Sequence, residues 1–230
     1  MRRYAAYILI SVWIGLPVWA GTWAINFDDA HDDGATRWGA NLPQPIGKWT
    51  FSQGAYLIEA SGGHWAGSFW GDASWTDYTV EVRARSTVGV GCIAITVRAQ
   101  DALNYYLWAF DVKGNRLAWL RGINGDFIHR TVDPAPGDPL AAHVLKVVVS
   151  GDGLEGYFDG ALIRRWQDEL YPSGSTGIGV GCGEGTAAVF DNLTIVGEAV
   201  QDRRPVNLDA RAVGPSHKLA TTWGAVKHTR

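Results

Sequence analysis

Apolar and polar residues alternate along most of the chain with the two-residue period of β-strands. The clearest predicted strands span residues 76–86, 91–100, 104–114, 116–124, 143–152, 153–166 and 186–197, and shorter ones are expected within 24–29, 47–60 and 64–71. Spacings of about 8 to 14 residues between strands are typical of sandwiches and barrels. No helical period is sustained between residues 21 and 198. The pattern therefore predicts an all-β body.

Turn-forming residues separate these runs, because Gly, Asn and Asp tolerate the positive φ angles that hairpins need. The turns are Lys113-Gly114-Asn115, Asn124-Gly125-Asp126, Gly151-Asp152-Gly153 and Asp159-Gly160. The alternation also assigns faces: Val80, Val82 and Ala84 share one side of their strand, opposite Glu81, Arg83 and Arg85. In the next strand Ile93, Ile95 and Val97 oppose Thr96 and Arg98. One sheet is therefore expected to carry a polar outer face.

The first 20 residues differ from this body. They carry Arg2 and Arg3, then an apolar run, then small residues around Ala20, which together predict a helical secretory signal. An uncleaved membrane anchor is the alternative, but Gly15 and Pro17 interrupt the apolar run. The expected location is secreted, periplasmic or on the cell surface, with no other membrane contact.

The last segment, residues 199–230, has Pro205 and a broken pattern, which indicates an appendage to a domain at 21–198. Ser216 is placed to cap a short helix in which Leu219, Trp223 and Val226 share a face. Such a helix is marginal alone, so the segment either docks on the body, binds a protein partner, serves as a sorting signal or forms a loosely ordered tail.

Charge and cysteine content narrow the functional classes. The 230-residue chain has a formal net charge of −3 and no long basic run, which argues against a nucleic-acid partner. Its two cysteines, Cys92 and Cys182, each end the string Gly-Val-Gly-Cys. They form either one disulfide or two buried thiols, because spacing alone does not give their geometry.

Several segments in order resemble the concanavalin A-like lectin/glucanase superfamily, in its laminin-G-like and 3-keto-disaccharide-hydrolase-like branch. They are NFDDAHDDGATRWG, GKWTFSQGAYLIEASGG, SWTDYTVEVRARS, CIAITVRAQDALNYYLWAF, HVLKVVVSGDGLEGYFDGALI and GSTGIGVGCGEGTAAVFDNLTI. The resemblance runs from Ile25 to Val196. It implies a two-sheet antiparallel jelly-roll β-sandwich that binds ligands on a concave face or on rim loops.

In such folds the first and last strands pair, which implies that Asp28 and Asp29 lie near Asp191 and Asn192, with Asp33 as a further neighbour. Clustered carboxylates repel unless a cation compensates them, and Ca²⁺ prefers carboxylate and amide oxygens. A structural calcium ion is one hypothesis. The alternative is that these residues only form turns and bond the local backbone.

Aromatic and polar side chains are the candidates for ligand binding. Flat aromatic rings stack on sugars while charged and amide groups bond the hydroxyls. The candidates are Glu81, Arg83, Arg98, Tyr105 and Asp111 on the polar face, with Trp65, Trp70 and Trp75 on a Gly-rich rim loop. Cross-strand ion pairs, such as Arg98 with Asp111, are the alternative role for the charged residues. Trp108 is expected to lie in the interior with Tyr106 and Phe110, and Trp49 also looks structural.

Catalytic patterns are absent from the sequence. No strand contains the Glu-x-Asp-x-Glu pattern of the superfamily's glucanases, and Asp168-Glu169 falls in a turn-like stretch. No Gly-x-Ser-x-Gly, His-Glu-x-x-His, CxxC or phosphate-loop motif occurs. The sequence therefore favours noncatalytic carbohydrate or glycan binding. A glycoside hydrolase of the 3-keto-disaccharide type and a laminin-G-like protein-adhesion module remain open.

Overall fold

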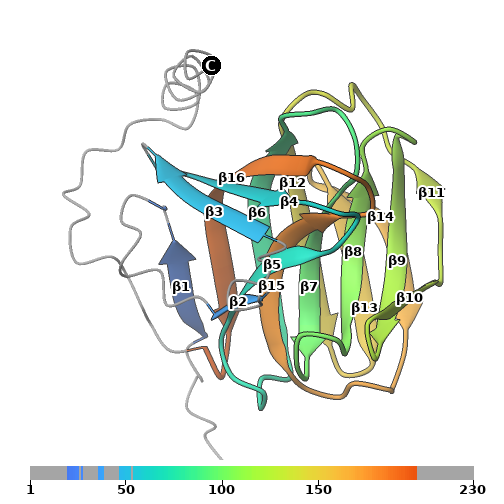
Figure 1. Ribbon diagram of the computed structural model, residues 1–230. Coiled ribbons are helices and arrows are strands. Elements are labelled where there is room, and N and C mark those ends of the chain that lie inside the picture. The colour runs from blue at the N-terminus through green and yellow to red at the C-terminus, as the bar shows by residue number, and fades with distance from the viewer. Residues whose placement is uncertain (1–19, 26, 28–35, 39–46, 53, 201–230) are drawn as a thin grey trace, which may run out of the picture.

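The computed structural model describes residues 20–25, 27, 36–38, 47–52 and 54–200, and these form an all-β structure without a helix (Figure 1). The strands are β1 (Gly21–Ile25), β2 (Thr36–Trp38), β3 (Gly47–Ser52), β4 (Ala55–Ala60), β5 (Ala66–Trp70), β6 (Tyr78–Ser86), β7 (Cys92–Ala99), β8 (Tyr105–Asp111), β9 (Arg116–Ile123), β10 (Asp126–His129), β11 (Asp133–Pro134), β12 (His143–Ser150), β13 (Gly153–Phe158), β14 (Ala161–Gln167), β15 (Ser175–Gly181) and β16 (Thr186–Gly197). The expected signal segment and C-terminal helix lie outside the described residues. Within them, no helix is long and apolar enough to cross a membrane.

Two antiparallel sheets face each other (Figure 1). Sheet A has the order β14-β13-β12-β6-β16-β4-β3, with β1 paired to β16. Sheet B has the order β10-β9-β8-β7-β15-β5-β2, with β11 paired to β9. The expected pairing of the first and last strands is present, since Ile25 lies opposite Leu193.

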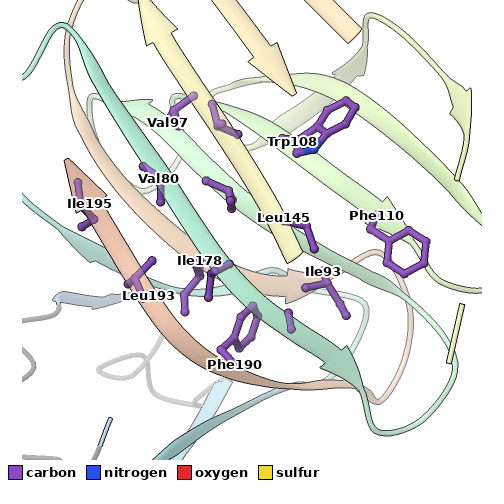
Figure 2. Packing of buried hydrophobic residues seen from close by; sticks show 14 of the residues in the cluster. Val80, Ile93, Val97, Trp108, Phe110, Leu145, Ile178, Phe190, Leu193 and Ile195 are labelled. Carbon is purple, nitrogen blue, oxygen red and sulfur yellow. The ribbon is translucent and has the colours of Figure 1, made fainter. Parts of the chain in front are cut away.

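The core fills the space between the sheets with side chains that alternation selects. Figure 2 shows Val80, Leu145 and Phe190 of sheet A meeting Ile93 and Ile178 of sheet B. Trp108 is fully buried there, as expected, and its indole Nε1 donates a hydrogen bond to the Tyr157 carbonyl at 3.0 Å. The indole also occupies the space in which a Cβ on Gly156 would sit, so the small residue at that position permits the close packing of the two sheets.

The interruption of the last strand by Asp191 and Asn192 is a β-bulge. The β6–β16 register shifts between Asp191 and Thr194, and Asn192 has a left-handed φ of 54°. Asn is among the few residues that adopt this conformation readily. The bulge places Asn192 on the surface while Leu193 and Ile195 return to the core.

Glycines in β5 and β15 form a platform for an aromatic side chain. Gly67, Gly179 and Gly181 all present their missing Cβ positions to the indole of Trp65 on the outer face of sheet B. A Cβ on Gly179 would lie 2.4 Å from the Ala66 carbonyl oxygen and 2.6 Å from Trp65 Cζ2. The repeated glycines therefore allow β15 to pass directly beneath Trp65.

We expect Gly179→Ala to lower the free energy of unfolding by about 1–3 kcal/mol, because the backbone oxygen of Ala66 cannot yield to the added methyl group. Urea unfolding followed by tryptophan fluorescence measures this loss. Gly183→Ala is the matched control in the same segment, since its Cβ meets nothing nearer than 3.6 Å. Equal stability of the two variants would contradict this packing.

Candidate ligand-binding surfaces

Glu81 and Arg83 lie on the outer face of sheet A, as the alternation predicts. Glu81 is exposed and its carboxylate lies 4.0 Å from the ammonium of Lys146. Arg83 is half-buried and stands opposite Asp191 in the β6–β16 register. This face carries cross-strand charge pairs.

Arg98 does not lie on an exposed polar face, because its side chain is buried with 1% of its surface exposed. Its guanidinium donates hydrogen bonds to the backbone carbonyls of Tyr171 at 3.1 Å, Thr76 at 3.3 Å and Gly151. These three carbonyls belong to three different loops at one end of the sandwich. Arg98 therefore joins the loops and is not available to a ligand, which corrects the expectation from sequence.

Tyr105 and Trp65 lie on the outer face of sheet B, but this face is apolar and largely covered. Tyr105 is 1% exposed, and its ring contacts those of Phe69 and Phe127 with centroids 6.0 Å apart in each case. Burial raises the pKa of Tyr105 well above its usual value. The side chain therefore stays neutral and packs against its aromatic neighbours.

Trp70 and Trp75 are core residues, although the sequence suggested an exposed rim. Trp70 is 1% exposed and its ring lies 6.3 Å from that of Phe27. Trp75 packs edge-on against Trp23 at 6.4 Å. Alternation within a Gly-rich stretch did not reveal that these indoles point between the sheets.

Asp111 pairs with Arg116 and not with Arg98. The Arg116 guanidinium lies 2.7 Å from Asp111 Oδ2, and the Gly114 N–H donates to Oδ1 at 3.0 Å. Partial burial acts to raise the pKa of Asp111, but the hydrogen bonds from Arg116 and Gly114 outweigh it and hold the pKa below the ordinary value. This ion pair closes the β8–β9 turn.

The expected calcium ligands fall largely outside the described residues, because Asp28, Asp29 and Asp33 are not among them. Asp191 is half-buried and Asn192 is exposed at the bulge. Within the described part of the chain, no group of three or more His, Cys, Asp and Glu side chains is gathered as a metal site. The calcium site stays a prediction.

An apolar pocket of about 80 Å³ opens on the outer face of sheet B. Its lining residues are Gly63, Trp65, Cys92, Leu107, Ala109, Leu120, Phe127 and Cys182. Side-chain carboxylates, amides and guanidinium groups are absent from this lining. The pocket therefore offers few partners for the hydroxyl groups of a sugar.

A larger polar cleft of about 580 Å³ lies where β9 approaches the segment that follows β14. Its lining residues are Arg121, Asp152, Gln167, Asp168, Glu169 and Leu170. The turn between β12 and β13 supplies Asp152, and the segment from the end of β14 supplies the acidic and amide groups. Gln167, Glu169 and Leu170 are exposed, so they are accessible to a ligand.

The base of the polar cleft is fixed by a buried network around Asp168. The Asp168 carboxylate forms an ion pair with Arg121 and accepts hydrogen bonds from the Tyr106 hydroxyl at 2.6 Å and the Leu170 N–H at 3.0 Å. The Tyr106 hydroxyl in turn accepts from the Tyr171 N–H at 2.9 Å. Burial raises the pKa of Tyr106, so its hydroxyl keeps the proton that it donates. These bonds tie the backbone at Leu170 and Tyr171 to side chains of β8 and β9.

Sequence reasoning missed this cleft. Asp168 and Glu169 stood out only as a turn-like acidic pair, and their partner Arg121 is 47 positions earlier, in β9. The alternation did give one indication of the cleft. Arg121 is an even number of positions from Leu117 and Trp119, so it lies on the face of β9 that points into the core. A charged residue on an inward face requires a buried partner.

No protein-family model matches the chain, and no curated protein matches its sequence. Among solved structures, the carbohydrate-binding module CBM66 from Bacillus subtilis is similar at 24% identity, with a TM-score of 0.59, covering 70% of this chain and 94% of that one. The Bacillus licheniformis β-glucanase is similar at 10% identity, with a TM-score of 0.57, covering 80% of this chain and 99% of that one.

This protein has the concanavalin A-like fold. A lichenase from a mouse hindgut metagenome is also similar, with a TM-score of 0.59 at 10% identity, covering 78% of this chain and all of that one. The resemblance drawn from ordered sequence segments is thereby confirmed at the level of the fold. The similar structures include both a carbohydrate-binding module and glycoside hydrolases.

Proposed function

We propose that this protein is a noncatalytic carbohydrate-binding domain that holds its glycan in the polar cleft. The observation that carries the proposal is the open cleft in which exposed Gln167 and Glu169 stand on the fixed Asp168–Arg121 pair. Carboxylate and amide groups bond sugar hydroxyls, and the bonded backbone of this segment limits how much must be ordered on binding. The similarity of the fold to a carbohydrate-binding module supports the same function.

The charges of the cleft favour a neutral glycan. Among the described lining residues, Asp152, Asp168 and Glu169 are acidic, and the one basic residue, Arg121, is engaged by Asp168. Uronic acids and sulfated sugars would meet uncompensated negative charge there. The hydroxyls of a neutral sugar can instead donate hydrogen bonds to these carboxylates. The exposed side chain of Leu170 offers an apolar surface to sugar C–H groups.

Hydrolysis is the weaker interpretation of this cleft. A glycosidase needs one carboxyl group that carries a proton to the leaving oxygen and a second one opposite it. Asp168 is committed to Arg121 and to its hydrogen-bond donors, so it serves as a support and not as an acid. We therefore expect binding without turnover.

Binding of the full chain to neutral and acidic polysaccharides, measured by affinity electrophoresis and titration calorimetry, tests the proposal. We expect a neutral glycan to bind and Glu169→Ala and Gln167→Ala each to weaken it by about tenfold or more, because each removes a hydrogen-bonding group from the ligand. Glu81→Ala is the matched control, since Glu81 is an exposed carboxylate on the outer face of sheet A.

Two results would contradict the proposal. Equal weakening by Glu81→Ala would move the site to the outer face of sheet A, and unchanged binding in both cleft variants would exclude the cleft. Product analysis by chromatography accompanies each binding glycan. Release of smaller sugars would favour the hydrolase alternative.

A further inference from the structure

The two cysteines lie side by side on neighbouring strands of sheet B. β7 and β15 are antiparallel, and Gly181 stands directly opposite Cys92 in their register. Cys182 follows Gly181 by one residue, and both cysteines line the apolar pocket. The structure shows both as free thiols, with Cys92 buried and Cys182 exposed.

An unusual backbone conformation brings the second thiol to the first. In a regular strand Cys182 would point away from the face that Gly181 and Cys92 share. Instead its φ is 65°, in the left-handed region that favours glycine, and its side chain turns to the same pocket as Cys92. Residues with a Cβ are disfavoured in this region, whereas glycine adopts it readily. Cys182 therefore takes this conformation at an energetic cost, although glycines stand on both sides of it at 181 and 183.

The surrounding backbone holds the two cysteines close together. A Cβ on Gly91 would lie 2.7 Å from the Gly181 carbonyl oxygen, so the chains adjoining the two thiols are in direct contact. The Thr186 hydroxyl lies 3.1 Å from the carbonyl oxygens of both Gly181 and Gly183, which brackets Cys182. The turn that presents Cys182 is therefore fixed from both sides.

The thiols differ in their surroundings. The Cys92 S–H donates a hydrogen bond to the Cys182 sulfur, which raises the pKa of Cys92, and burial raises it further. The same hydrogen bond lowers the pKa of Cys182, against the opposing effects of burial and of Asp111. Cys182 belongs to the more exposed position and its sulfur accepts the hydrogen bond, so it is the better nucleophile of the pair.

We propose that Cys92 and Cys182 form a dithiol–disulfide pair in which Cys182 reacts first and Cys92 resolves the product. The Cys182 thiolate attacks one sulfur of a small-molecule disulfide, whose S–S bond breaks and releases one thiolate. Cys92 then gives its proton to that thiolate and attacks the Cys182 sulfur, which expels the second half of the reagent. Two protein thiols are oxidised to one disulfide, and one small disulfide is reduced to two thiols.

The full chain, incubated in glutathione buffers from fully reduced to strongly oxidised and then alkylated, tests this chemistry by intact mass. We expect an oxidised monomer that lacks two hydrogens and takes up no alkylating reagent. Thermal melting of that species should lie a few °C above the reduced chain, because the bond links strands far apart in sequence. Two alkylatable thiols that persist in excess oxidised glutathione would overturn the proposal.

Single variants test the order of reaction. Cys92→Ser should accumulate a glutathione adduct on Cys182, whereas Cys182→Ser should leave Cys92 largely unmodified over the same time. Peptide mapping of the unmutated chain after brief treatment with limiting maleimide checks the order without any substitution, and Cys182 should carry the label. Preferential labelling of Cys92, or a lasting glutathione adduct on the unmutated chain, would contradict the assignment.

Discussion

Replacing Arg98 by alanine should lower the free energy of unfolding by at least about 3 kcal/mol, because a buried side chain is removed and three backbone carbonyls would each lose a charged donor. For a domain of this size the loss corresponds to a fall in Tm of roughly 6–12 °C. The same three bonds join the loops at one end of the sandwich. Thermal unfolding followed by circular dichroism measures the change.

Arg130→Ala is the control for this prediction, since Arg130 is exposed and its loss should change the free energy of unfolding by less than about 0.5 kcal/mol. Arg98→Lys should fall between the two, because an ammonium group reaches fewer carbonyls than a guanidinium fork. A stable Arg98→Ala variant would mean that the loops hold together without this side chain. Any weaker glycan binding by the variant must be compared at a temperature where it is folded.

Replacing Asp168 by alanine should cost about 3–5 kcal/mol of stability, because it leaves the Arg121 guanidinium without its carboxylate in a half-buried site. It also removes the acceptor for the Tyr106 hydroxyl and the Leu170 N–H. Urea unfolding at constant pH measures the stability. Because this network supports the polar cleft, glycan binding should be lost as well.

A double-mutant cycle separates the pair from the rest of the network. Replacing Arg121 by methionine together with Asp168→Ala should cost less than the sum of the two single changes, since the double variant buries no unpaired charge. Tyr106→Phe is a milder control that removes one donor and keeps the ion pair. Simple additivity in the cycle would show that Arg121 and Asp168 do not depend on each other.

The two-residue alternation of apolar and polar residues correctly predicted the apolar face of several strands. Val80, Ile95 and Trp108 are in the core, and Glu81 and Arg83 are outside it, as alternation requires. The same reasoning was wrong for Arg98, because alternation in its strand places this residue on the outer face whereas the structure buries it. Its burial depends on loops that arrive from distant parts of the chain, and a local pattern does not contain them.

Strand β15 shows a second limit of local reasoning. Its glycines lower strand propensity, so the segment did not stand out among the clearest predicted strands. The reason for these glycines is Trp65, which lies just before β5 and whose indole covers Gly179 and Gly181. The predicted exposure of Trp65, Trp70 and Trp75 failed for the same reason, since each ring is covered by a distant segment.

By itself, the sequence determined that the chain forms antiparallel strands, which faces of most strands are apolar, and that the order of segments resembles a concanavalin A-like sandwich. These properties follow from the two-residue period and from turn chemistry, which act over a few residues. Only the tertiary structure decided which polar residues meet: Arg121 with Asp168, Arg98 with three loops, and Cys92 with Cys182. Those contacts join residues far apart in the chain, so their geometry is set by how the two sheets pack.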